Sequence, residues 1–238
     1  MFGFLKPRKQ AKVPYTATRY ELFADMLAQP HLLIAGATGS GKSVIVNDLI
    51  YTAMIDGQSQ FILIDPKRVE LVRYKRISQT IRYASEPDDM IKALHEAMSI
   101  VEARYRAMAK AGVRKSSDRQ VYVIIDELAD LMTTSRKEVQ PLLQRLCQVG
   151  RAAGVHVIAC TQCPLATVIP TPIKVNFDAR VGLRTRCRQD SRNILDETGC
   201  ETLPRYGQAF YMTPEGTDKW NIPMIPDEKL DEAVEYWS

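Results

Sequence analysis

Eight residues near the start of the chain, GATGSGKS at positions 36–43, match the phosphate-loop pattern G-x-x-x-x-G-K-[ST] in full. Glycines in such a loop let backbone N–H groups close around phosphate oxygens, and the helix that follows adds partial positive charge. Lys42 would reach the β- and γ-phosphates, and the Ser43 hydroxyl would face Mg²⁺. The stretch therefore predicts a site for a nucleoside triphosphate with Mg²⁺, formed by Gly36, Ala37, Thr38, Gly39, Ser40, Gly41, Lys42 and Ser43.

Two adjacent carboxylates supply the second half of this chemistry. Residues 121–126, VYVIID, form an apolar run that ends in Asp126, and Glu127 follows at once. A carboxylate at the carboxyl end of a buried strand can hold Mg²⁺ through its water shell, and an adjacent glutamate can deprotonate a water for attack on the γ-phosphate. An Asp-Glu pair alone is also typical of the acidic first turn of a helix. The upstream phosphate loop favours a nucleotide hydrolase, with Asp130 as a surface or helix-capping acid.

A third stretch concentrates positive charge. Four of the nine residues in RTRCRQDSR are arginine, at Arg184, Arg186, Arg188 and Arg192. If the segment is extended, the first three share one face, because side chains alternate along a strand. Guanidinium groups on one face suit the phosphate backbone of a nucleic acid without reading its sequence. The alternative for each arginine is a solvated strand face or a salt bridge between subunits.

The elements that position these residues alternate along the chain. Short apolar runs predict buried strands, and apolar residues at helical spacing predict the helices between them. The strands are expected at 31–37, 60–65, 121–126 and 155–161, and the helices at 42–57, 86–112 and 135–154. This alternation predicts an α/β fold with a parallel sheet covered on both faces.

The pattern changes after residue 176. Residues 176–186 read as a further strand, 207–222 as a strand pair joined by a turn, and 227–237 as a closing helix. The expected fold is therefore a central, mainly parallel sheet flanked by helices, with antiparallel strands near the C-terminus.

The composition is that of a globular protein. The chain has 238 residues, of which 45% are hydrophobic and 25% charged, and its net charge is +4. No apolar run approaches the roughly 18–20 residues of a membrane span, and the N-terminus lacks the apolar centre of a signal peptide. We therefore expect a cytoplasmic protein without a membrane span. A basic cluster near the N-terminus is typical of a solvated tail, with contact to DNA or a membrane surface as the alternative: Lys6, Arg8, Lys9 and Lys12.

Cysteine usage points away from disulfides and structural zinc. The five cysteines are odd in number and irregularly spaced, which argues against a disulfide framework. Cys160 and Cys163 form a CxxC motif, but no second pair stands at a matching spacing for zinc.

Several longer segments carry a family resemblance. HLLIAGATGSGKSVIVN, FILIDPKRVEL, VIIDELADLM, GRAAGVHVIACTQCP and DSRNILDETGCETL resemble the motor domain of the FtsK/SpoIIIE family of DNA translocases over residues 31–213. The resemblance implies a RecA-like ATPase that uses ATP and Mg²⁺ and forms hexameric rings around double-stranded DNA. It also implies a γ-phosphate sensor at Gln162 and an arginine finger at Arg151 that reaches the neighbouring subunit's nucleotide, and it aligns Arg188 and Arg192 with DNA contacts.

The departures from the family pattern are as informative. Cys163 stands where members usually carry arginine after the TQ dipeptide, and we hypothesise that Arg184 and Arg186 offset this loss. Residues 1–30 are expected to be a short basic segment, vestigial of the extra motor subdomain of large members. Residues 31–238 are expected to form the motor domain of a minimal type typical of mobile elements.

Three functions remain to be separated. The leading one is an ATP-driven double-stranded DNA translocase acting as a homo-oligomeric ring. The second is a coupling ATPase of conjugation or plasmid transfer, which would need a relaxase or secretion-channel partner. The third is a non-motor, ATP-dependent DNA-binding adaptor, against which the intact set of Asp126, Glu127, Gln162 and Arg151 argues.

Overall fold

The computed structural model describes residues 17–55 and 57–238. The basic cluster expected at Lys6 to Lys12 lies outside the described residues. No helix among those described is both long and apolar enough to cross a bilayer.

Eight strands in the described part of the chain form one sheet, in the order β3-β2-β4-β5-β1-β6-β7-β8. Neighbours from β3 to β6 are parallel, and β7 and β8 add two antiparallel strands at one edge. The strands are β1 (His31–Ala35), β2 (Ser59–Ile64), β3 (Thr80–Ala84), β4 (Gln120–Ile125), β5 (Val155–Thr161), β6 (Ala179–Gly182), β7 (Gln208–Thr213) and β8 (Gly216–Asn221).

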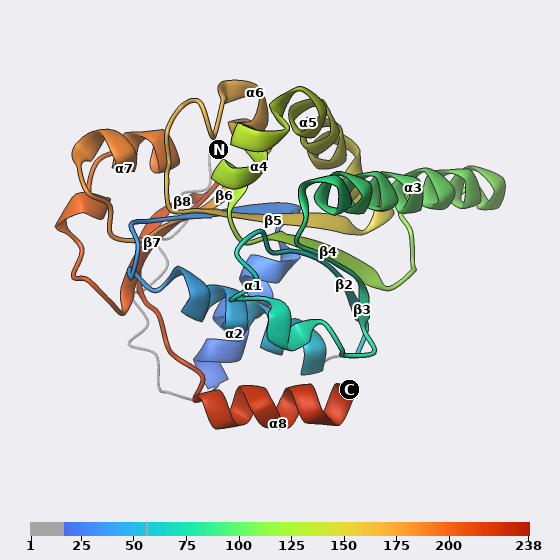
Figure 1. Ribbon diagram of the computed structural model, residues 1–238, viewed down its shortest axis with the longest axis horizontal. Coiled ribbons are helices and arrows are strands. Elements are labelled where there is room, and N and C mark those ends of the chain that lie inside the picture. Colours follow the sequence, from blue (N-terminus) through green and yellow to red (C-terminus); the bar gives the residue numbers. More distant parts are fainter. Residues whose placement is uncertain (1–16, 56) are drawn as a thin grey trace, which may run out of the picture.

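Helices cover both faces of this sheet (Figure 1). On one side lie α3 (Pro87–Ala111), α4 (Leu128–Thr134), α5 (Arg136–Ala153) and α6 (Thr171–Lys174); on the other lie α1 (Ala17–Ala28), α2 (Lys42–Ile55) and α8 (Asp227–Trp237). Beyond β6 the chain forms α7 (Arg188–Leu195), and two short 3₁₀ helices, η1 (Val72–Tyr74) and η2 (Cys200–Thr202), complete the elements.

Side chains that alternate along the strands pack into two hydrophobic cores, one on each face of the sheet. In β1, Leu33 packs under α3 and α5, whereas Leu32 and Ile34 pack toward α1 and α2. Both cores are closed to solvent, which explains why the strands read as continuous apolar runs. The helix α1 is part of the second core, because Phe23 is fully buried and Asp25 accepts a hydrogen bond from the Tyr211 hydroxyl at 3.2 Å.

The long helices begin and end where local backbone chemistry requires it. The first residue of α3 is Pro87, whose missing N–H costs nothing there, and acidic residues follow in the first turn. Both α3 and α5 end at a left-handed glycine, Gly112 with φ 68° and Gly154 with φ 65°.

The predicted fold class is confirmed: a mainly parallel sheet is flanked by helices and extended by antiparallel strands. The strand expected at 176–186 is much shorter, since β6 ends at Gly182. A Cβ on Gly182 would lie 2.5 Å from the Cys200 sulfur, so η2 packs tightly over the end of this strand and the chain turns away. The edge strand β3 was not predicted, because only Ala84 of its five residues is buried and the strand carries little apolar signal.

Candidate active site

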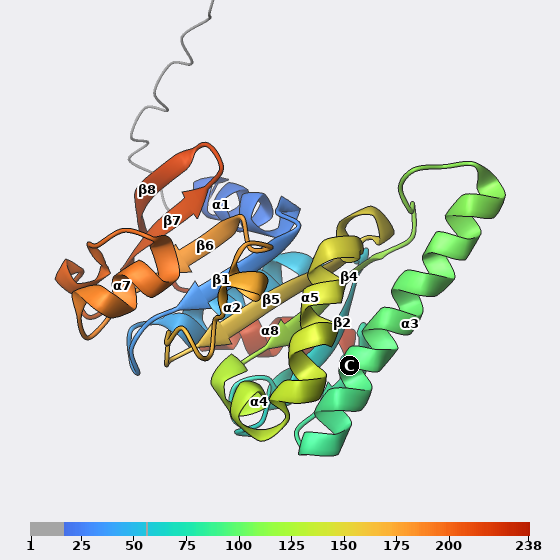
Figure 2. The same ribbon diagram turned by 90° about the horizontal axis from the view of Figure 1, so that it is seen from above.

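The predicted chemical groups meet at one edge of the sheet. The phosphate loop follows β1, the paired carboxylates follow β4, and Gln162 follows β5, which lies between the other two strands. Parallel strands place their carboxyl ends at the same edge, where α/β proteins bind their ligands. Figure 2 shows these strand ends and the loop before α2 together at one end of the molecule.

The glycines of the phosphate loop are required by space and by backbone geometry. A Cβ on Gly36 would lie 2.6 Å from the Leu183 Cβ and 2.7 Å from the Ser40 hydroxyl. The backbone of Gly41 has a φ of 101°, a conformation that residues other than glycine rarely adopt. The loop is also tied to the segment after β6, since the Ala37 N–H donates to the Arg184 carbonyl at 2.8 Å. A shift of the phosphate loop would therefore directly displace residues 184–192, the arginine segment.

Lys42 and Asp126 form a buried ion pair at the start of α2. The Lys42 ammonium donates to the Asp126 Oδ1 at 2.7 Å and to its backbone carbonyl at 3.1 Å, and the two side chains are 4% and 1% exposed. Burial alone would lower the pKa of Lys42, but Cys160, Asp126 and Glu127 more than offset it, so the pKa lies above its ordinary value. The lysine therefore stays charged and available to a phosphate.

The second carboxylate oxygen of Asp126 supports the prediction of Mg²⁺. This Oδ2 and the Ser40 hydroxyl are buried and have no hydrogen-bond partner among the described residues. Buried polar atoms are normally satisfied, so an unpaired carboxylate oxygen beside a phosphate loop fits a hydrated divalent cation. Asp126 and the Ser43 hydroxyl would hold that ion.

Glu127 is buried in a cage of donors. Its Oε1 accepts from the Thr161 hydroxyl at 2.7 Å and from the Gln162 N–H at 3.2 Å, and the carboxylate also caps α4 through the Ala129 N–H. Its Oε2 pairs with the Lys67 ammonium at 3.3 Å. These contacts fix the orientation of the carboxylate.

Gln162 links the phosphate loop to this carboxylate. Its side-chain Oε1 accepts a hydrogen bond from the Thr38 hydroxyl at 2.8 Å, while its backbone N–H donates to Glu127. A ligand atom that displaces Thr38 from Gln162 would therefore disturb the cage around Glu127. This geometry suits the predicted sensor, whose role stays a prediction.

Arg151 lies apart from these groups. It is exposed in the last turn of α5, just before the amino end of β5, whereas Gln162 follows the carboxyl end of the same strand. The seven residues of β5 separate the two by roughly 20 Å at about 3.3 Å per residue. Arg151 therefore cannot act on the phosphate loop of its own chain, and the predicted finger requires a second copy.

The arginine segment differs from the extended strand that the sequence suggested. All four arginines are exposed, but α7 begins at Arg188, so the single extended face is wrong. Arg192 lies in the last turn of α7. Arg188 and Arg192 share a helical face, being four residues apart. Two of the four have acids within the chain, Asp190 at 3.3 Å from Arg186 and Glu201 at 3.6 Å from Arg188.

The far end of α7 is firmly anchored. Asp196, its left-handed C-cap, pairs with Lys174 and with Arg180 at 2.6 Å. Burial would raise the pKa of Asp196, but these two cations lower it below its ordinary value. The helix therefore presents Arg188 and Arg192 from a rigid support.

Two contributors to the site escaped the sequence reasoning. Thr161 and Lys67 hold Glu127, yet neither was assigned a role. Lys67 belongs to the DPK stretch that follows β2. Its position after the carboxyl end of a parallel strand is the feature from which a role in the site could have been predicted.

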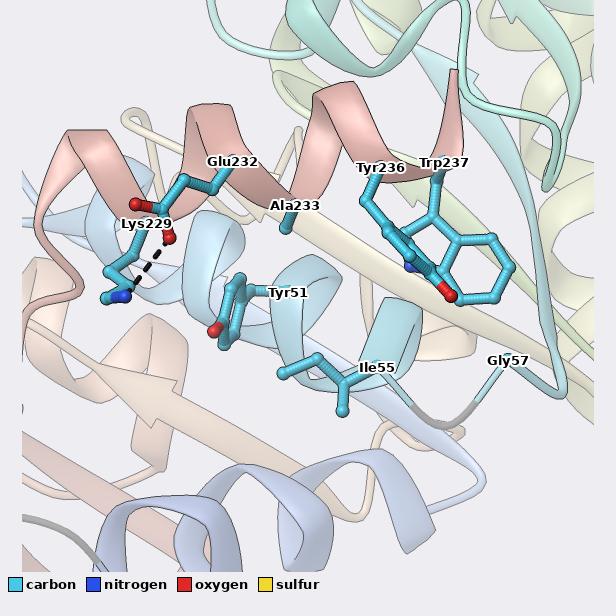
Figure 3. Close-up of a pocket in the computed structure, with 8 residues that line it drawn as sticks. All are labelled: Tyr51, Ile55, Gly57, Lys229, Glu232, Ala233, Tyr236 and Trp237. Carbon is cyan, nitrogen blue, oxygen red and sulfur yellow. Dashed lines mark hydrogen bonds and ion pairs between the residues drawn. The ribbon is translucent and has the colours of Figure 1, made fainter.

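A surface hollow lies elsewhere on the molecule. Figure 3 shows it between α2 and α8, with a volume of about 510 Å³ and none of the residues of the phosphate loop in its lining. Tyr51 and Ile55 line it from the far half of α2, so it is separate from the site described above.

Comparison with known proteins agrees with this geometry. A model of the FtsK/SpoIIIE family matches residues 6–122 and 117–166. The DNA translocase FtsK of Chlorobaculum tepidum is 36% identical over an alignment that covers 89% of this chain and 30% of that protein. The DNA translocase FtsK of Agrobacterium fabrum is 35% identical, with 90% and 29% covered. The chain thus spans about a third of the length of these relatives.

Among solved structures, the conjugation coupling protein TcpA of pCW3 in its monomer form with ATPgS superposes with a TM-score of 0.79. It is 24% identical, and the alignment covers 90% of this chain and 66% of that one. This likeness shows a shared fold. Because the family model matches more than half of the residues and the motif side chains converge at one edge of the sheet, the chain belongs to the FtsK/SpoIIIE family.

Proposed function

We propose that this chain is an ATP-hydrolysing motor that moves along double-stranded DNA as a homo-oligomeric ring, a hexamer by resemblance to its family. One observation carries the proposal furthest: the phosphate loop is hydrogen-bonded to the arginine segment. The Ala37 N–H donates to the Arg184 carbonyl, and the Leu183 N–H donates to the Ala35 carbonyl, both at 2.8 Å. A nucleotide-driven shift of the loop would therefore move guanidinium groups suited to DNA phosphates.

Hydrolysis would use the buried carboxylate. The phosphate loop and Lys42 bind the triphosphate, and bound Mg²⁺ would neutralise charge on the β- and γ-phosphates. Glu127 accepts a proton from the attacking water as the oxygen–phosphorus bond forms and the bond to the β-phosphate oxygen breaks. The hydrogen bonds from Thr161 and Gln162 hold the Glu127 carboxylate in a fixed orientation.

Binding and loss of the γ-phosphate would shift the DNA-binding arginines through Gln162 and the phosphate loop. Thr38 now donates to Gln162, and a γ-phosphate near the loop competes for both groups. Its arrival and loss would switch this hydrogen bond, and the Ala37–Arg184 link would carry the shift to the arginine segment.

The position of Arg151 supports the proposed assembly into an oligomer. Its exposed guanidinium lies at the opposite end of β5 from the phosphate loop, so it is available to the nucleotide of another copy. Such a head-to-tail contact is heterologous, and repeated contacts of this kind form a ring when the rotation between copies closes. Arg151 would then neutralise charge on the transferred phosphoryl group across the interface.

The experiment is an ATPase assay with and without long duplex DNA at low salt, together with displacement of a protein roadblock from DNA. The motor predicts DNA-stimulated turnover and ATP-dependent displacement, both lost in Lys42→Ala. In a measurement of molecular mass with ATPγS and duplex DNA, the motor predicts a ring. The Arg151→Ala variant would still form this ring but would lose ATP turnover. Absence of any DNA stimulation in the wild-type chain would refute the motor and favour the adaptor.

A coupling ATPase that passes DNA to a secretion channel is the second candidate. The fold similarity to the coupling protein TcpA motivates it, whereas the identity of 36% to an FtsK translocase favours the first. Binding of a relaxase to the purified chain, measured by calorimetry, would favour the coupling role.

A further inference from the structure

A fifth arginine lies beside the phosphate loop, outside the arginine segment described above. Arg205 belongs to the turn LPRYG, which joins η2 to β7. A Cβ placed on Gly39 would lie 3.5 Å from its Nη2 and 3.9 Å from its Nε. Gly39 occupies the middle of the phosphate loop, so the guanidinium group stands against the part of the loop that surrounds the phosphate chain. Figures 1 and 2 both place this turn at the same end of the sheet as the loop between β1 and α2.

The charge of Arg205 is not neutralised within the described part of the chain. Among the described residues no carboxylate lies within ion-pair distance of it, in contrast to Arg186 and Arg188, which pair with Asp190 and Glu201. The side chain is exposed, so a ligand can reach it. An exposed, unpaired guanidinium beside a phosphate-binding loop is suited to a phosphate oxygen, to which it can donate two parallel hydrogen bonds.

Its neighbour holds it in place. The Arg205 guanidinium lies over the Tyr206 ring, with 5.1 Å between its carbon and the ring centroid, and such a cation–π contact orients the fork. On one side of the pair the backbone is anchored by Leu203, which is 2% exposed, and on the other Gly207 adopts a left-handed turn with a φ of 78°. The turn thus leaves a buried residue and reverses at a glycine, with the Arg205 guanidinium next to Gly39.

We propose that Arg205 binds the α- or β-phosphate of the nucleotide held by its own copy, with Tyr206 as its positioning residue. This inference rests on the proposed function only in that the loop binds a nucleoside triphosphate. The role differs from that of Arg151, which lies at the other end of β5 and can serve only a second copy. Because the loop surrounds the α- and β-phosphates, the contact is common to ADP and ATP.

The test is equilibrium binding of fluorescent mant-ADP and mant-ATPγS with Mg²⁺ and without DNA. Arg205→Ala should weaken both nucleotides by about tenfold, the equivalent of one charge-assisted hydrogen bond at a solvent-exposed site. Arg205→Lys should recover only part of the loss, because an ammonium cannot donate in the planar fork. Tyr206→Ala should cost a few-fold, since it frees the guanidinium without removing it.

A matched control separates this from a general loss of positive charge. Arg106→Ala removes an exposed arginine from α3, which lies at the opposite end of the sheet in both views, and should leave both affinities unchanged. Lys42→Ala should abolish binding and so validate the site. Unchanged affinities in Arg205→Ala, or a loss for mant-ATPγS alone, would overturn the assignment while the proposed function stood. A lack of binding by the wild-type chain would overturn both.

Discussion

Replacing Glu127 with glutamine is the sharpest perturbation of the proposed chemistry. The carboxylate is 3% exposed, and every partner in its cage is a donor: the Thr161 hydroxyl, the Gln162 and Ala129 N–H groups, and the Lys67 ammonium. Glutamine has the same shape but presents an NH₂ group at one of the two oxygen positions. Wherever that group points, a donor faces a donor, and the proton acceptor is lost.

This geometry sets the expected loss of turnover and the expected loss of folding free energy in Glu127→Gln. Loss of a general base costs about 10²- to 10⁴-fold in turnover, or roughly 3–5 kcal/mol in the activation barrier. One lost charge-assisted hydrogen bond in a buried cage costs about 1–3 kcal/mol of folding free energy. In a domain of this size that lowers the melting temperature by roughly 2–12 °C, so the protein remains folded at 25 °C.

The assay is single-turnover hydrolysis with saturating protein and duplex DNA, combined with mant-ATPγS binding and thermal denaturation of the same samples. Glu127→Gln should bind nucleotide within a few-fold of wild type while losing turnover. Asp130→Asn is the matched control, because it neutralises a nearby acid on α4 that takes no part in the cage, and its turnover should stay within threefold. A Glu127→Gln protein that kept more than a tenth of the wild-type rate would show that another group accepts the proton.

Three further outcomes test separate parts of the structure. Gly150→Ala should lower the free energy of unfolding by about 3 kcal/mol, because its Cβ would lie 2.3 Å from a backbone oxygen at the start of β5, and thermal denaturation within 2 °C of wild type would contradict the packing. Burial, with a smaller effect from the neighbouring imidazole, lowers the pKa of His31 from 6.5 to about 4, so the folded state binds fewer protons than the unfolded state between these values. Stability should thus be complete above pH 6.5 and fall by about 3 kcal/mol as the pH drops to 4, as measured by urea unfolding at a series of pH values, with a shallower slope in His31→Asn. The double change Arg184→Ala with Arg186→Ala should weaken DNA stimulation of the ATPase and reduce the salt dependence of DNA binding by one to two phosphate contacts, as judged by the log–log slope, and an unchanged slope would remove these arginines from the DNA interface.

The parts of the fold that could be predicted are those encoded by neighbouring residues. The phosphate loop depends on glycines, a preceding strand and a following helix, all within one short stretch. Asp126 and Glu127 could be placed because they end a continuous apolar run, and parallel strands bring their carboxyl ends to a common edge. The half-exposed strand β3 and the early end of β6 could not be predicted, since they depend on what packs against them.

The sequence by itself thus determined the parallel sheet, the triphosphate loop and the carboxylate pair, because local backbone rules and apolar periodicity are properties of adjacent residues. Only the tertiary structure decided that Lys67 pairs with Glu127, that Arg205 stands against Gly39, and that Arg151 lies at the opposite end of β5 from its own phosphate loop. These relations join segments far apart along the chain. They arise from the order in which strands are laid side by side, which no short stretch of residues specifies.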